Sequence, residues 1–106
     1  MNPKLKLEIN NITNQIVKKY NPQRIILYGS TAIGRAKSDS DLDLLIIKNT
    51  TQDPIRRVQV LSSLIDRTVP CDFLVYTPQE IKKRLTLGDF FIKEILEQGK
   101  IMYETS

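Results

Sequence analysis

The chain has 106 residues, of which 41% are apolar and 26% charged, with one cysteine and no histidine. This size and composition are typical of one globular domain, 1–106, whose core needs no disulfide or structural metal. Because histidine is absent, the chain cannot build a Ser-His-Asp or Cys-His site or bind zinc through imidazole. Any catalysis must therefore use carboxylates, hydroxyls, amines or a bound metal.

The chain carries a net charge of +4, with short basic clusters such as Lys18-Lys19 and Arg56-Arg57. These clusters fit solvated helix faces better than a polyphosphate site. No apolar run approaches the roughly 20 residues that cross a bilayer, and residues 1–11 lack the apolar segment of a signal peptide. A lone Cys71 forms no internal disulfide. We therefore expect a cytoplasmic protein with no membrane partner and no direct nucleic-acid partner.

Apolar periodicity and turn residues predict an α/β fold with a small mixed β-sheet packed by helices. Two helix starts are well marked: Asp53-Pro54 is an N-cap followed by proline, and Thr77 begins a capping box that ends at Glu80. We expect strands over Arg24–Tyr28, Asp41–Ile47, Cys71–Tyr76 and Lys100–Glu104. We expect helices over Leu5–Tyr20, from Pro54 to about Arg67, after Thr77 and over Asp89–Gln98, with a single helical turn over Thr31–Arg35. In the helix from Pro54, the side chains of Val58, Leu61, Leu64 and Ile65 should face inward.

Three carboxylates lie at the starts of two predicted strands. Asp41 and Asp43 are two residues apart, so their side chains project to the same side of one strand, and Asp72 opens the next strand in the same way. Two like charges ~4 Å apart cost roughly 4 kcal/mol at an effective dielectric of 20. Clustered oxygens suit Mg²⁺, with Mn²⁺ as a substitute, and two such ions would clamp a phosphoryl-group transfer. Asp39 fits a turn residue better than a metal ligand.

A Gly-Ser pair follows the first predicted strand at Gly29-Ser30. Glycine allows close approach of a phosphate, and the serine hydroxyl and nearby N–H groups can donate to its oxygens. Alone this pair fits an ordinary turn equally well, but beside the carboxylates it favours a phosphate site. Rival motifs fail: a P-loop needs Lys and Ser/Thr where Arg35 and Ala36 stand, and neither a dinucleotide fingerprint nor a nucleophile elbow is present. Cys71 fits a small core residue.

The assembled pattern resembles the minimal nucleotidyltransferase (MNT) family of the polymerase beta-like superfamily. Gly29-Ser30 is followed by ten residues and then by Asp41-Leu42-Asp43, and "SDLDLLI" and "ILEQGKIMYE" are similar to that family's aspartate strand and C-terminal ending. The resemblance implies a polymerase beta-like palm fold. It also implies that Gly29 and Ser30 bind the phosphates of ATP. Asp41, Asp43 and Asp72 would be catalytic and would bind two Mg²⁺ ions. Many relatives carry an arginine directly before the glycine that corresponds to Gly34, and here Arg35 or Lys37 would contact phosphate in its place.

The same resemblance implies a partner. Members of the MNT family are commonly paired with a helical HEPN toxin, to which such an antitoxin transfers AMP on a tyrosine, and 106 residues leave no room for a separate acceptor domain. We expect the two chains to form a hetero-oligomer. The apolar residues Leu87, Phe90, Phe91, Ile92, Ile95 and Leu96 either bind this partner or lie in the chain's own core. A non-catalytic antitoxin that only binds its partner is the main alternative, and a metal-dependent nuclease is disfavoured because it has no use for the Gly-Ser turn.

Overall fold

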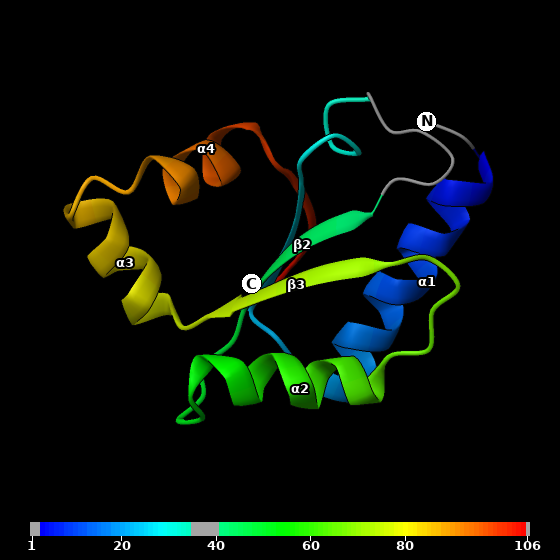
Figure 1. The fold of residues 1–106 in the computed structure, drawn as a ribbon, viewed down its shortest axis with the longest axis horizontal. Coiled ribbons are helices and arrows are strands. Elements are labelled where there is room, and N and C mark those ends of the chain that lie inside the picture. Colours follow the sequence, from blue (N-terminus) through cyan, green and yellow to red (C-terminus); the bar gives the residue numbers. More distant parts are fainter. Residues whose placement is uncertain (1–2, 35–40, 106) are drawn as a thin grey trace.

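The computed structural model describes residues 3–34 and 41–105, and the helices and strands expected from the sequence are present in it, apart from the short helical turn expected over Thr31–Arg35 (Figure 1). In the described part of that segment, Thr31–Gly34 form a turn closed by a hydrogen bond from Gly34 N to Thr31 O (3.3 Å). In chain order the elements are α1 (Pro3–Tyr20), β1 (Arg24–Tyr28), β2 (Leu42–Ile47), α2 (Pro54–Leu64), β3 (Cys71–Tyr76), α3 (Pro78–Thr86), α4 (Phe90–Gln98) and β4 (Lys100–Glu104).

The four strands form one mixed sheet in the order β3-β2-β1-β4. Strand β1 runs antiparallel to both of its neighbours, whereas β2 and β3 are parallel and are joined through α2. As a result, the C-terminal end of β1 lies beside the N-terminal ends of β2 and β3. The small mixed sheet expected from the sequence is thereby confirmed.

Helices cover both faces of the sheet (Figure 1). On one face, α1 and α2 pack over alternate residues of β1, β2 and β3, among them Leu27, Leu44 and Phe73. On the other face, α3 and α4 pack over the intervening residues, among them Leu45 and Ile47. Strand β2 is therefore apolar on both faces because both are covered, as expected for a central strand.

Helix α2 is shorter than the sequence suggested. It begins as expected, with the Asp53 side chain accepting a hydrogen bond from Arg56 N, but it ends at Leu64 rather than near Arg67. Ile65 leaves the helix in an extended conformation and buries its side chain. Gln15 of α1 then takes the next peptide group, donating to Asp66 O (2.6 Å) and accepting from Asp66 N (2.8 Å). Contacts with another helix therefore end α2 before its own pattern does.

Arg57 corrects the expectation that the Arg56-Arg57 pair belongs to a solvated face. Its side chain is buried and pairs with Glu80 at 2.6 Å, and it also donates to the carbonyl of Val75 (3.2 Å). Glu80 accepts from Thr77 N (2.8 Å) as well, which completes the capping box of α3. Arg57 thus joins α2 to the start of α3 around the end of β3, and it is a structural residue rather than a phosphate ligand.

Candidate active site

The candidate site lies where the end of β1 meets the starts of β2 and β3. Tyr28 is opposite Asp43 in the antiparallel pair, and Asp43 is level with Asp72 in the parallel pair. Residues that are level on neighbouring strands project from the same face, about 4.8 Å apart. This face also carries Leu45 and is the one covered by α3 and α4. Strand register therefore places two of the three candidate acids side by side.

Asp43 is the half-buried member of the acidic group, whereas Asp41 and Asp72 are exposed. Burial raises the pKa of the Asp43 carboxyl above its ordinary value. The nearby charge of Asp72, a hydrogen bond with Asp72 and the charge of Asp41 raise it further. Asp72 and Asp41 are thus both close enough to act electrostatically on Asp43. Repulsion of this kind is relieved either by a proton or by a cation.

Gly29 forms a tight bend against Asp43. Its φ of 76° lies in the left-handed region, which favours glycine. A Cβ atom built at this position would collide with Oδ2 of Asp43. Ser30, the next residue, is exposed. The bend therefore lies directly beside the Asp43 carboxylate. A site that binds both a phosphate chain and its metal ions requires this proximity.

The donors at this site fit a hard divalent cation. Among the residues the structure describes, no three Asp, Glu, Cys or His side chains enclose a metal ion on their own. Mg²⁺ does not need such a cage, since it usually keeps several waters and is held by one or two carboxylates together with substrate phosphates. The Asp43–Asp72 pair, with Asp41 nearby, supplies carboxylates of this kind. Their mutual repulsion is what a cation would neutralise.

Arg35 and Lys37, the two predicted phosphate contacts, lie outside the described residues. The predicted turn residue Asp39 also lies outside them. Their roles remain predictions, as do those of Gly29, Ser30, Asp41, Asp43 and Asp72.

Tyr28 is a site residue that sequence reasoning missed. Burial, followed by the charges of Asp43 and Asp72, raises the pKa of its hydroxyl to about 12. The hydroxyl therefore stays protonated at physiological pH, and it lies close enough to Asp43 and Asp72 to feel their charges. Its ring meets that of Phe91 edge to face, with the ring centroids 5.8 Å apart. Its position at the end of a buried strand, directly before the Gly-Ser pair, was the available signal.

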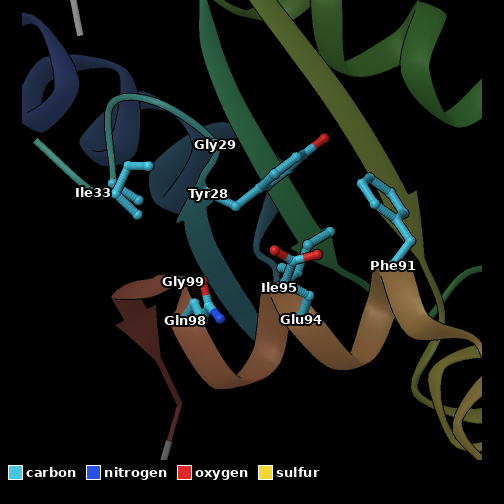
Figure 2. Close-up of a pocket in the computed structure, with 9 residues that line it drawn as sticks. Tyr28, Gly29, Ile33, Phe91, Glu94, Ile95, Gln98 and Gly99 are labelled. Atoms are coloured by element: carbon cyan, nitrogen blue, oxygen red, sulfur yellow. The ribbon is translucent and has the colours of Figure 1, made fainter. Parts of the chain in front are cut away.

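A pocket of about 250 Å³ adjoins the bend (Figure 2). It lies between the bend and α4, and its lining includes Tyr28, Gly29, Ile33 and Phe91. Sequence reasoning did not predict it. Its lining comes from two segments about 60 residues apart, so no local motif could show it.

The apolar residues around α4 divide between core and surface. Ile92 and Ile95 are buried and Leu96 is partly buried, so the core interpretation holds for them. Phe90 is 83% exposed and Leu87 75% exposed, whereas Phe91 is half exposed beside Tyr28. Leu85, Leu87 and Phe90 thus form an exposed apolar group at the α3–α4 turn, which we call the α3–α4 patch.

A glycine bend against paired strand carboxylates, on a mixed sheet of this topology, is an arrangement suited to phosphoryl or nucleotidyl transfer. The sequence matches the family model "Polymerase beta, Nucleotidyltransferase" over residues 10–106. The chain belongs to this family, and its class is therefore that of a nucleotidyltransferase. The polymerase beta-like fold expected from the sequence is confirmed.

Among solved structures, the chain is similar to one described as "Crystal structure of the toxin-antitoxin with AMP-PNP". The TM-score is 0.62 and the identity 22%, and the match covers 92% of this chain and 73% of that one. No curated protein sequence matches the chain. Within the described residues, none of the helices is both long and apolar enough to cross a bilayer.

Proposed function

We propose that the chain is a Mg²⁺-dependent nucleotidyltransferase that transfers AMP from ATP to a tyrosine hydroxyl of a HEPN-type helical toxin, and so acts as the antitoxin. The family supports nucleotidyl transfer, and the similar structure is a toxin–antitoxin complex with an ATP analogue. The observation that carries the proposal is the register of Asp43 with Asp72 beside the Gly29 bend. Because the reaction needs ATP and the lone thiol suits reducing conditions, we place the protein in the cytoplasm.

In this proposal Gly29 and Ser30 bind the β- and γ-phosphates, with the backbone N–H groups and the serine hydroxyl as donors. The toxin hydroxyl approaches from the side of Asp72, which accepts its proton. The hydroxyl oxygen bonds to the α-phosphorus, the bond from that phosphorus to the bridging oxygen breaks, and pyrophosphate leaves. Positioning and charge neutralisation supply most of the rate increase. Arg35 and Lys37 are proposed to bind the phosphates as well.

Asp41, Asp43 and Asp72 would hold Mg²⁺, with Mn²⁺ as a substitute. When bound, the metal neutralises charge on the triphosphate and on the acidic group and favours departure of pyrophosphate. The carboxylates of Asp41 and Asp72 are exposed, so water and phosphate oxygens can reach the same ion.

The α3–α4 patch is the surface that we propose for the toxin. It consists of exposed apolar side chains next to the helix that borders the site, and such groups commonly mark protein interfaces. Replacing Leu87 and Phe90 by serine should weaken the complex at least tenfold. The matched control is Ile55→Ser on α2, where the side chain is 72% exposed but lies on another helix. Equal affinity of both variants for the toxin would place the interface elsewhere.

The proposed reaction is tested with ATP labelled at the α-phosphate, Mg²⁺ and the purified HEPN-type toxin from the same genome. Label should appear on a toxin tyrosine, and the toxin should lose activity in parallel. The double variant Asp41→Asn with Asp43→Asn should bind the toxin normally but transfer no label.

Transfer that persists in that double variant would exclude these acids as the catalytic group. Neutralisation of the toxin without any transfer by the unaltered chain would instead establish the alternative, an antitoxin that acts by binding. The two outcomes are separated by following label and toxin activity in the same samples.

A further inference from the structure

The pocket beside the Gly29 bend has apolar walls and a polar edge (Figure 2). Ile33 comes from the turn after β1, Ile95 lies on the α4 side, and the rings of Tyr28 and Phe91 complete the apolar lining. Ile33 is 53% exposed, so its contact surface is available to a ligand rather than packed in the core. Apolar walls with a few polar groups are typical of small-molecule sites.

The polar edge consists of Glu94 and Gln98, both on α4. They are four residues apart, so they share one face of the helix, one turn apart. Within the described part of the chain, neither side chain makes a hydrogen bond or an ion pair. The pocket therefore offers an amide that both donates and accepts, beside a carboxylate that accepts only when ionised.

The pocket shares Tyr28 and Gly29 with the candidate phosphate site. Along the sheet, Asp72 lies on β3, Asp43 on the neighbouring β2, and the bend at the end of β1. The pocket continues from the bend to α4, and none of the described residues that line it comes from β2 or β3. A ligand in this pocket would therefore leave Asp72 on β3 open to a hydroxyl acceptor.

We propose that this pocket binds the base of the nucleotide and selects adenine. The inference rests on the proposed function, because it assigns the pocket to the same nucleotide. A base has two apolar faces, which fit between Ile33 and the aromatic rings, and a polar rim, which meets α4. Glutamine pairs well with the amino group and adjacent ring nitrogen of adenine. The Glu94 carboxylate accepts from an amino group but is repelled by the carbonyl oxygen at that position in guanine or uracil.

The assignment is tested by binding titrations with Mg²⁺ and four probes: ATP, GTP, UTP and inorganic tripolyphosphate. Tripolyphosphate has no base, so it reports on the phosphate site alone. The unaltered chain should bind ATP about tenfold more tightly than GTP, UTP or tripolyphosphate. Ile33→Trp, which fills the pocket from an exposed position, should weaken the affinity for ATP about tenfold and leave the affinity for tripolyphosphate unchanged. The control is Ile55→Trp, a change of the same size at an exposed position on α2.

Two further variants test the polar edge without changing side-chain volume much. Gln98→Leu should reduce the preference for binding ATP over GTP to within about threefold. Glu94→Gln should strengthen the binding of GTP and UTP relative to that of ATP. All variants should keep the melting temperature of the unaltered chain within a few degrees, because the three altered side chains are exposed.

The possible results separate this inference from the proposed function. Equal affinity for all four probes, or an ATP affinity that Ile33→Trp does not change, would overturn the base pocket while leaving the phosphate site intact. Selective ATP binding without transfer to the toxin would refute the proposed reaction but support the pocket. Failure to bind both ATP and tripolyphosphate would overturn both.

Discussion

Replacing Asp43 by asparagine should stabilise the protein in metal-free buffer at neutral pH. Burial and the charges of Asp72 and Asp41 raise the pKa of the Asp43 carboxyl, so its ionised form is unfavourable in the folded state. An asparagine amide removes the charge, keeps nearly the same shape and can still donate a hydrogen bond to Asp72. Destabilising charge clusters of this kind are expected where a ligand supplies the missing counter-charge.

The magnitude follows from strand spacing. Two carboxylates about 5 Å apart repel by about 3 kcal/mol at an effective dielectric of 20. Because Asp72 is exposed, solvent screening reduces this to about 1 kcal/mol. In a domain of this size, 1 kcal/mol corresponds to an increase in melting temperature of about 4–8 °C.

The effect has a defined pH dependence. Because the pKa is raised, the folded state binds the Asp43 proton more tightly than the unfolded state does. The unaltered chain therefore gains stability as the pH falls from above the raised pKa towards the ordinary value of 3.8. Above the raised pKa that gain is lost. The advantage of Asp43→Asn should therefore be full at pH 7 and should shrink on acidification through the raised pKa.

The measurement is a thermal melt of both proteins in EDTA and in Mg²⁺, at pH 7 and at pH 4. Mg²⁺ should raise the melting temperature of the unaltered chain and change that of Asp43→Asn little. Asp66→Asn, a change of an exposed acid near the end of α2, is the matched control and should change neither value. A variant that is less stable than the unaltered chain in EDTA at pH 7, or that responds equally to Mg²⁺, would refute the reasoning.

Three further changes test other parts of the structure. Gly29→Ala should lower the melting temperature by about 5–10 °C and weaken ATP binding at least tenfold. Alanine is strained at a φ of 76°, and its Cβ would displace the Asp43 carboxylate. Unchanged ATP affinity would contradict this. Arg57→Ala should cost about 2 kcal/mol in urea denaturation, because the buried Arg57 side chain loses its ion pair with Glu80 and its hydrogen bond to Val75 O. Arg56→Ala on the exposed face should cost less than about 0.5 kcal/mol, and equal losses would count against a structural role for Arg57. Burial raises the pKa of the Cys71 thiol to about 11. Iodoacetamide at pH 8 should therefore react with Cys71 in the folded chain about 100-fold more slowly than with free cysteine, and unfolding should remove this protection. Rapid labelling of the folded chain would be inconsistent with this.

Much of the fold could be predicted because local patterns and tertiary structure agree. Capping signals at Asp53 and Thr77 and apolar runs in the strands marked each element within a few residues. The pairing of Asp43 with Asp72 could be anticipated once the two strands were taken as neighbours, because side-chain direction in a strand follows a simple alternation.

The features that could not be predicted depend on contacts between distant segments. Arg57 lies on a helix that reads as polar, and only the position of Glu80 beyond the next strand explains its burial. Helix α2 ends early because Gln15, some 50 residues upstream, binds the peptide group of Asp66. The pocket likewise needs α4 to pack against the end of β1. None of these contacts leaves a periodic signal in the sequence.

The division of the site between sheet and helix has an evolutionary consequence. The carboxylates of Asp43 and Asp72 project from hydrogen-bonded strands, where interstrand spacing keeps their separation nearly constant. Helix α4 and the exposed turn before it carry no part of that spacing. Substitutions there would exchange one nucleotide or one acceptor protein for another while the phosphorus chemistry stays the same, so a single ancestral scaffold would diversify its targets without rebuilding its sheet.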